Sequence, residues 1–403
     1  MKDTMLHIAQ LVRSTLKYSL FHHVEPTPDN SEKSTLSSQT TCAASRLHGG
    51  ALAVATQLKG KVLHLSDLTK VFASWPTATN KRVRELENLV DSLLERVVTN
   101  ERKLKALKQA DFARLMSLWY PDAEWPELLV ATAYSVWIFV WDDEIDAGDT
   151  DAANHEEQAQ AYYKQSLAYI RSQLGLDKDQ KNDIEAPHQN MTLFADVGRG
   201  LLEATDIQQR QRFFNELENF MLQVGVEHSH RMAGTMPTTE EYMEIRSGSV
   251  GCAPQIAITD YMLKIRLPET IMECAVMQSL WRETVYICLI LNDVYSVQKE
   301  ILQGSLLNIV PVKFHNMKQG QRNMDAVSRD LDLTLKETME RFEAAAEEFA
   351  AMAPEDSELH GNILDYIKWC RYFITGVLYW SLESRRYGMA KCINADGTLS
   401  IRL

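Results

Sequence analysis

The sequence contains little glycine and little proline. Glycine accounts for 17 of the 403 residues, about 4%, where proteins in general have roughly 7%, and there are only 11 prolines. Because a many-stranded sheet needs frequent tight turns, this scarcity favours long helices. Hydrophobic residues make up 45% of the chain and charged residues 24%, which excludes wholesale disorder and allows a large buried core.

Paired cysteines, long apolar runs and an excess of positive charge are also missing. The six cysteines form no CxxC pair or short-spaced framework, so we expect reduced thiols inside a cell. No run of 18 apolar residues occurs, so we expect no stable membrane insertion and a cytoplasmic location, with a mitochondrial presequence over residues 1–24 as the alternative. The net charge of −13 disfavours binding to nucleic acid.

The pattern of apolar residues predicts one large helical domain behind an N-terminal extension. Residues 1–75 form the extension, and a Ser/Thr/Pro-rich stretch at 25–48 is typical of a linker. The domain covers residues 76–403, where the apolar residues between Leu86 and Val97 recur at the spacing of one buried helix face. No segment shows the period-2 alternation of a strand. Further helices are predicted at 126–145, 154–174, 208–232, 239–247, 252–265, 268–301, 324–352 and 360–388.

An apolar and aromatic segment, residues 136–141, ends in a cluster of acids. Four acidic side chains fall within the five residues 142–146. Asp142 and Asp146 are four residues apart and share one face of a helix, where like charges gain from a multivalent cation. Because all the ligands offer oxygen, a hard ion such as Mg²⁺ fits. The alternative interpretation is a solvated helix end.

A second polar group follows the apolar residues 285–291. Asn292, Ser296 and Glu300 are successively four residues apart, so an amide, a hydroxyl and a carboxylate form a column about 6 Å apart per step. Such a column can chelate one hard cation. Lys299 stands beside it and can meet an anion that the cation also binds.

The two motifs resemble the metal motifs of class I terpene synthases. D-D-x-x-D at residues 142–146 and N-D-x-x-S-x-x-K-E at residues 292–300 are similar to that family's pair, at a similar separation. Trp380 with Arg386 and Tyr387 resembles the W-x5-R-Y ending of its microbial members. Arg246, 46 residues before the second motif, resembles the family's diphosphate-sensing arginine. In style the chain looks most like a fungal sesquiterpene synthase.

This resemblance implies an all-α fold, a single class I terpenoid-synthase helical bundle around a central active-site cavity. It implies about three Mg²⁺ ions per site and farnesyl diphosphate as the substrate, ionised and cyclised to a sesquiterpene hydrocarbon or alcohol. The metal ligands implied are Asp142, Asp146, Asn292, Ser296 and Glu300. The diphosphate-binding residues implied are Arg246, Lys299, Arg386 and Tyr387, and the catalytic residues are Asp142, Arg246 and Trp380.

Aromatic faces are expected to stabilise the cationic intermediates. Rings near the two motifs could line the cavity, and Trp380 is the first choice because it lies about two turns before Arg386. The rings considered are Tyr134, Trp137, Phe139, Trp141, Tyr295 and Trp380. After Arg246 the chain departs from the family, because Ser249 and Val250 stand where Asp or Thr and then Gly are common.

Two other functions remain open from the sequence. One is an isoprenyl chain-elongating transferase, which also uses Mg²⁺ but carries two aspartate-rich motifs. The other is a non-catalytic helical protein that binds a prenyl diphosphate. The Asn-Ser-Glu pattern favours cyclisation over elongation, and the chain could act as a monomer or a homodimer.

Overall fold

The computed structural model describes residues 47–146, 150–177 and 184–403. Packing divides the chain into two units, Met1–Thr41 and Cys42–Leu403, and the first of them lies outside the described residues, as does nearly all of the predicted 25–48 linker. The boundary predicted at residue 76 falls within the second unit. None of the helices in the described ranges combines the length and the apolar character needed to cross a bilayer.

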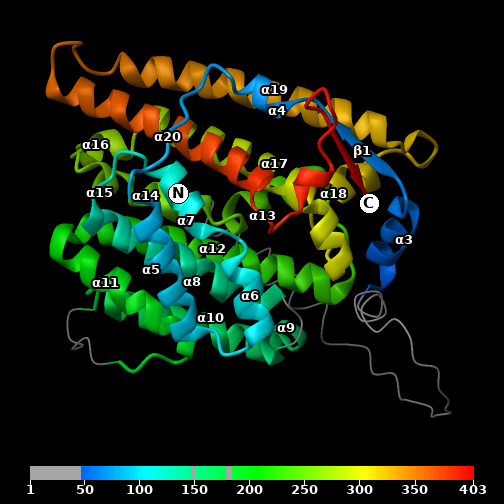
Figure 1. Cartoon of the computed structure of the whole chain (residues 1–403), viewed down its shortest axis with the longest axis horizontal. Coiled ribbons are helices and arrows are strands. Elements are labelled where there is room, and N and C mark those ends of the chain that lie inside the picture. The colour runs from blue at the N-terminus through cyan, green and yellow to red at the C-terminus, as the bar shows by residue number, and fades with distance from the viewer. Residues whose placement is uncertain (1–46, 147–149, 178–183) are drawn as a thin grey trace. The chain divides into compact units, whose positions relative to one another are not determined.

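The second unit is an assembly of helices with a small two-stranded sheet (Figure 1). Its first half contains α3 (Gly49–Leu58), β1 (Val62–Leu65), α4 (Leu68–Val71), α5 (Val83–Val97), α6 (Glu101–Lys108), α7 (Phe112–Trp119), α8 (Trp125–Asp146), α9 (Asp151–Asn154), α10 (Glu156–Gln173) and α11 (Thr192–Ala204). Its second half contains α12 (Ile207–Ala233), α13 (Thr239–Ser249), α14 (Cys252–Ala257), α15 (Thr259–Leu263), α16 (Glu269–Met272), α17 (Ala275–Gln303), α18 (Ile309–Asn316), α19 (Met324–Ala350), α20 (Glu358–Glu383) and β2 (Leu399–Arg402). The predicted all-α helical bundle is confirmed.

The long helix α17 forms the centre of the packing. It contacts α13, α14, α19 and α20. Residues 287–291 are all buried, as the unbroken apolar run predicts. The helix stops at Gly304, whose φ of +83° turns the chain so that the N–H of Ser305 reaches back to the carbonyl of Glu300 at 2.9 Å. The whole column of Asn292, Ser296 and Glu300 therefore lies on one uninterrupted helix.

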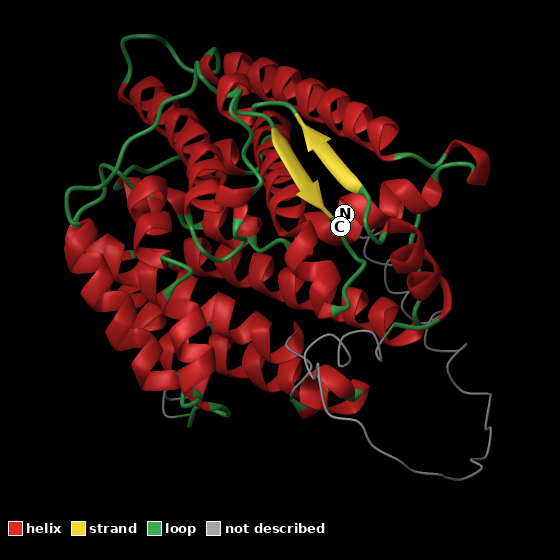
Figure 2. Cartoon of the chain, turned by 45° about the vertical axis from the view of Figure 1, so that its right-hand side comes forward, coloured by secondary structure: helices red, strands yellow, loops and turns green. Residues whose placement is uncertain are grey.

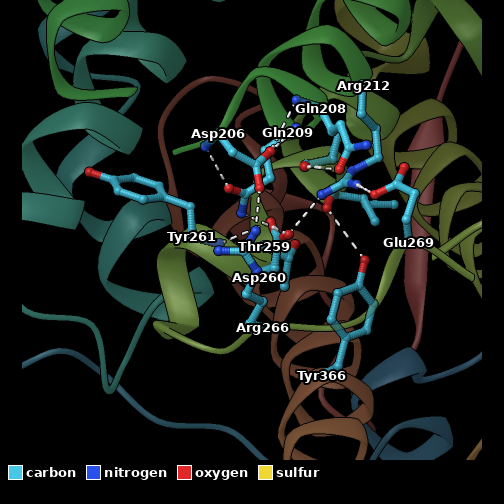
Figure 3. Close-up of polar contacts among 12 residues, drawn as sticks. Asp206, Gln208, Gln209, Arg212, Thr259, Asp260, Tyr261, Arg266, Glu269 and Tyr366 are labelled. Atoms are coloured by element: carbon cyan, nitrogen blue, oxygen red, sulfur yellow. Dashed lines mark hydrogen bonds and ion pairs between the residues drawn. The ribbon is translucent and has the colours of Figure 1, made fainter. Parts of the chain in front are cut away.

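Two of the predicted helices are each divided into two in the structure, and a third is shorter than predicted. The segment 252–265 divides into α14 and α15, and 268–301 divides into α16 and α17. At the first break, the buried carboxylate of Asp260 turns toward α12 and accepts hydrogen bonds from Arg212 (2.7 Å) and Gln209 (3.0 Å), as Figure 3 shows. These hydrogen bonds replace the water that a buried carboxylate loses, and they fix the direction in which α15 leaves α14.

The helix predicted over 360–388 ends at Glu383. Ser384 has the extended backbone of a residue leaving a helix, with φ of −69° and ψ of 154°. Arg386 and Tyr387 therefore lie beyond α20, on a segment that can turn independently of the helix axis. This turn carries both side chains to the cavity described below.

The structure also contains one pair of short strands, which the sequence pattern did not reveal. β1 and β2 pair antiparallel, with Leu63 opposite Ile401 and Leu65 opposite Leu399, and Figure 2 shows the pair beside the long helices. These four side chains are buried, while the residues between them are more exposed. Each strand has only four residues, so the alternation was too short to recognise. The pairing ties the segment before residue 76 to the C-terminus.

Candidate active site

A cavity of about 820 Å³ lies among the helices of the second unit. On α8 its lining runs from the aromatic and apolar Tyr134, Ile138 and Phe139 to the acidic Asp142 and Asp143. α17 repeats this order, from Cys288 to polar residues near its end. Other lining side chains come from α6, α7, α9, α12, α13, α14 and α20. The cavity thus has an apolar part and a polar part.

The first acidic cluster lies at the C-terminal end of α8, at the polar part of the cavity. Asp142 and Asp143 both line the cavity, and Asp143 Oδ1 is 3.8 Å from a terminal guanidinium nitrogen of Arg386. Glu144 forms an ion pair of 3.1 Å with Lys103 of α6. The backbone of Asp146 belongs to α8, but its side chain lies outside the described residues. The structure therefore brings Asp142 to the cavity and leaves Asp146 as a prediction.

The second polar group is on α17. Asn292 and Glu300 line the cavity, whereas Ser296 is buried and its Oγ donates to the carbonyl of Asp293 over 3.4 Å. Asn308 Nδ2 donates to Glu300 Oε2 at 2.9 Å. Burial raises the pKa of Glu300, and the negative charge of Asp293 raises it further. A cation beside Glu300 would relieve both effects.

Arg246 joins α13 to α17. Its Nε donates to Asp293 Oδ1 at 2.9 Å, and a terminal nitrogen donates to Asn292 Oδ1 at 2.8 Å. Asp293 is fully buried, and Tyr242 Oη and the N–H of Ile309 both donate to its other oxygen. Arg246 is thus held rigidly at the wall of the cavity, 13% exposed, by the residue next to the predicted ligand.

Arg386 and Tyr387, the residues predicted from the W-x5-R-Y ending, lie close to the second motif. Tyr387 Oη accepts a hydrogen bond of 3.1 Å from Asn292 Nδ2, although the two residues are 95 positions apart. The Arg386 guanidinium lies 4.9 Å above the ring of Phe139. Within the described part of the chain, its buried Nε has no hydrogen-bond partner. Lys299 also lines the cavity. Positive groups from α13, α17 and the segment after α20 therefore converge on one region.

Trp380 lines the cavity, and so do Phe139 and Tyr134. Phe139 and Trp380 have ring centroids 5.9 Å apart, and Trp380 Nε1 is fixed by the carbonyl of Ala110 at 2.7 Å. The indole face is therefore presented in one orientation.

Three of the six rings considered for the cavity do not belong to its lining. Trp137, Trp141 and Tyr295 are buried in the core instead. Trp141 Nε1 donates to Ser166 Oγ at 2.9 Å, and Trp137 Nε1 points to Met191 Sδ at 3.4 Å. The expectation that these rings line the cavity is wrong, because they lie on faces of α8 and α17 that pack against other helices.

Comparison with known protein families identifies the family of this chain. Residues 133–341, more than half of the chain, match the family described as terpene synthase family 2, C-terminal metal binding. The chain belongs to terpene synthase family 2. It is an enzyme of the terpene cyclase class, whose substrate is a prenyl diphosphate and whose site binds a divalent metal.

Several curated proteins are similar to this terpene synthase over most of its length. The sesquiterpene cyclase hepA of Aspergillus oryzae is 28% identical over 359 residues, which cover 87% of this chain and 95% of that protein. The terpene cyclase braA of Annulohypoxylon truncatum is 27% identical, covering 81% of this chain and 86% of that protein.

Solved structures agree on the fold. That of α-eudesmol synthase has a TM-score of 0.66 at 16% identity and covers 76% of this chain and 97% of its own. That of germacradien-4-ol synthase from Streptomyces citricolor has a TM-score of 0.62 at 17% identity, covering 76% and 96%.

The donor set of this terpene synthase fits a hard divalent cation. Across the described ranges, no three His, Cys, Asp or Glu side chains are grouped as a metal site. Among the three predicted ligands of the second motif, Glu300 offers a carboxylate, Asn292 an amide and Ser296 a hydroxyl, while the carboxylate of Asp293 is taken up by Arg246. Neutral and anionic oxygens together are the ligands that Mg²⁺ and similar ions accept.

Several lining residues of the terpene synthase were missed by sequence reasoning. Glu227 and Arg231 reach the cavity from α12, Lys103 from α6 and Gln255 from α14. None belongs to a spaced motif. Glu227 and Arg231 are four residues apart, which places them on one helix face, but α12 is a long helix rich in charges and this pair had no distinguishing neighbour.

Proposed function

We propose that this terpene synthase is a Mg²⁺-dependent sesquiterpene synthase that cyclises farnesyl diphosphate to a sesquiterpene hydrocarbon or alcohol and releases diphosphate. The observation that carries the proposal is the division of the cavity into a polar and an apolar part. On both α8 and α17 the polar lining residues follow the apolar ones, and the contacts of Arg386 with Asp143 and of Tyr387 with Asn292 join the two polar ends. A prenyl diphosphate is likewise divided, into a polar diphosphate group and an apolar prenyl chain.

The polar part would hold the metal ions and the diphosphate. Asp142 and Asp146 would bind on the α8 side, and Asn292, Ser296 and Glu300 on the α17 side. When bound, Mg²⁺ stabilises the negative charge that develops on the departing diphosphate. The raised pKa of buried Glu300 supports this assignment, because a neighbouring cation is the simplest way to keep that carboxylate ionised.

Arg246, Lys299, Arg386 and Tyr387 would bind the diphosphate. The buried Arg386 Nε, which has no protein acceptor among the described residues, supports an anionic ligand at this point. Fixed positive groups around a leaving group lower the barrier to breaking the C–O bond, because they require no reorganisation as charge develops.

The apolar part would protect the carbocations. Phe139 and Trp380 present aromatic faces at fixed orientations, and such faces attract cations. Val250 and Val377 extend the apolar lining. An aromatic and apolar lining would exclude water from the cation until cyclisation is complete.

A C15 substrate is supported by relatives named as sesquiterpene enzymes, among them the cyclase hepA and the synthase Agr1 of Cyclocybe aegerita. The cavity volume of about 820 Å³ lies within the usual range of ligand sites, roughly 300–1,000 Å³. Chain elongation is disfavoured because Asn292 and Ser296 stand where a second aspartate-rich motif would be required. The cytoplasmic location and the oligomeric state stay predictions.

The test is turnover of purified protein with farnesyl diphosphate, read by gas chromatography and mass spectrometry. We expect a cyclic C15 product with Mg²⁺ and none with EDTA, restored by excess Mg²⁺. Parallel assays with geranyl and geranylgeranyl diphosphate test the chain length. An assay with added isopentenyl diphosphate tests elongation, since a longer prenyl diphosphate would identify a transferase.

Two variants on the same helix separate the site from the scaffold. Asn292→Ala should reduce turnover to background. Gln298→Ala is the matched control, because Gln298 donates to the carbonyl of Arg402 at 2.8 Å and does not line the cavity. Equal activity of both variants would contradict the assignment of the second motif, and a folded wild-type protein without any product would contradict the cyclase proposal.

A further inference from the structure

Gln255 places an amide at the apolar part of the cavity, and the function proposed above gives it no role. The residue lies on α14, is buried and lines the cavity. Cys252, three residues earlier, also lines the cavity, so the two side chains share one face of the helix. Because a buried amide is costly when its polar atoms have no partner, the surroundings of this side chain are informative.

Two contacts show that the start of α14 borders the apolar part. Burial raises the pKa of the Cys288 thiol on α17, and the neighbouring thiol of Cys252 raises it further. Gly251 lies against α8, where an added Cβ would come within 3.2 Å of Ile138 Cδ1. Cys288 and Ile138 belong to the apolar stretches that precede the two motifs. Gln255, one turn further along the same face of α14, therefore belongs to this part of the wall.

Tyr120 fixes the orientation of the amide. Gln255 Nε2 donates a hydrogen bond to Tyr120 Oη. Tyr120 follows α7, is buried and does not belong to the cavity lining. The nitrogen of the amide therefore points out of the cavity, and its oxygen, on the other side of the same planar group, is left at the wall. Among the described residues, Gln255 Oε1 receives no hydrogen bond.

Tyr120 is held in place independently of Gln255. Its ring stacks on that of Trp369 with the centroids 5.9 Å apart, and its backbone carbonyl accepts a hydrogen bond of 2.7 Å from Asn80 Nδ2. Burial raises the pKa of Tyr120, so the phenol stays uncharged. The amide thus has a neutral and rigid partner, and its dipole is fixed in direction before any substrate binds.

We propose that Gln255 is a specificity-determining residue whose amide oxygen stabilises the carbocation when the positive charge lies at this wall of the cavity. A fixed dipole in apolar surroundings acts strongly on a nearby cation. Phe139 and Trp380 attract a cation over a whole ring face, whereas one oxygen atom favours one position of the charge. It thereby selects the intermediate from which ring closure or proton loss follows. The inference rests on the proposed function for one point, the formation of carbocations in the cavity.

A role of Gln255 in filling space would not depend on the direction of its amide. Two substitutions separate the two roles. Gln255→Met keeps an unbranched side chain of similar length and removes the amide. Tyr120→Phe leaves every lining side chain in place and removes the hydroxyl that orients the amide. Only a role of the oriented amide predicts the same change from both substitutions.

Tyr366→Phe is the matched control. Tyr366 is a buried tyrosine of α20 that does not line the cavity. Its Oη donates to the backbone carbonyl of Ile256, the residue after Gln255, over 3.4 Å, and accepts from Trp281 Nε1 at 2.7 Å. This substitution therefore removes a buried hydroxyl that contacts α14 but leaves the partner of the amide in place. We expect its products to be those of the wild type.

The first measurement is the product ratio from farnesyl diphosphate, read by gas chromatography and mass spectrometry. In Gln255→Met and in Tyr120→Phe, the ratio of the main product to the by-products should change about 5- to 30-fold in the same direction. KM should stay within about threefold of the wild type, because the amide acts after ionisation. The double variant should match Gln255→Met alone, since Tyr120 acts only through the amide.

Binding of a stable cation tests the inference without turnover. The probe is the tetraethylammonium ion, measured by calorimetry with saturating Mg²⁺ and inorganic pyrophosphate so that the polar part of the cavity is occupied. Aromatic walls bind such quaternary ammonium ions, and a nearby amide oxygen should add to this binding. We expect Gln255→Met and Tyr120→Phe to bind the ion about 5- to 30-fold more weakly than the wild type, and Tyr366→Phe to bind it equally well.

Unchanged products or an unchanged affinity in Gln255→Met would overturn the role of the amide, and so would a wild type that does not bind tetraethylammonium. A change in Gln255→Met that folded Tyr120→Phe does not share, or that Tyr366→Phe shares, would also overturn it. If Tyr120→Phe does not fold, the affinity of Gln255→Met decides, because methionine fills similar space without the dipole. If no prenyl diphosphate is converted but the affinities fall as expected, the cyclase proposal fails while the role of Gln255 stands.

Discussion

Replacing Arg246 by alanine separates two tasks of this residue. Arg246 neutralises Asp293, which is fully buried, and by our proposal it also binds the substrate diphosphate. After Arg246→Ala, the carboxylate keeps its hydrogen bonds from Tyr242 and Ile309 but loses the guanidinium group 2.9 Å away. Breaking a buried pair by removing one partner costs about 3–5 kcal/mol of unfolding free energy.

A second substitution should return most of that stability. In Arg246→Ala/Asp293→Asn the side chain at 293 is uncharged and nearly isosteric, and its amide oxygen can accept from Tyr242 and Ile309. The remaining loss should be about 1–2 kcal/mol, the value of ordinary buried hydrogen bonds. Turnover should not return, because the guanidinium is still absent.

Denaturant unfolding followed by circular dichroism measures the free energies, and product formation from farnesyl diphosphate measures turnover. Arg199→Ala is the control, since this arginine is 69% exposed and pairs with Asp196 one turn away, a contact worth about 0.5 kcal/mol or less. If Arg246→Ala were as stable as the control, Arg246 would not be what neutralises Asp293. If the double variant regained turnover, the role of Arg246 would be structural only.

Three further predictions follow from other parts of the structure. Arg212→Leu should lower the unfolding free energy by about 3–5 kcal/mol because Asp260 stays buried without its 2.7 Å partner, and Asp260→Asn in the same chain should recover part of it; independent losses would refute the pairing. Phe139→Leu should lower turnover about 2- to 30-fold and change the products by removing an aromatic face, so identical products would contradict its place at the cation. Deleting residues 399–403 should make the segment carrying β1 sensitive to protease, and unchanged resistance would show that the strand pairing is dispensable.

The helices that carry the two motifs could be predicted from the sequence. Both the apolar run that defines each helix and the spacing of the motif residues depend only on residues that are close together in the chain. The apolar run before Asp142 and the one before Asn292 are long enough to define a helix, and each motif follows within one turn. Spacing of four residues then places Asn292, Ser296 and Glu300 on one face without knowledge of the fold. α17 runs unbroken through all three, as expected.

Predictions failed where the environment of a residue depends on partners that are distant in the sequence but close in space. Trp137 and Trp141 are close to the motif in sequence, but a helix of the interior has apolar residues on every side, and periodicity does not say which side faces a cavity. In the same way, β1 could not be found without its partner, because four residues gain little as a strand until Leu63 meets Ile401 from the other end of the chain.

The position of Glu227 beside Arg246 and Ser249 is the clearest case of information that a motif does not contain. Sequence comparison draws attention to Ser249 because it departs from the common pattern after Arg246, and it offers no reason to look 22 residues earlier. The structure supplies Glu227 from another helix, at hydrogen-bond distance of Ser249 and beside Arg246. A search by motif spacing cannot find such a contact, because Glu227 and Ser249 lie on different helices.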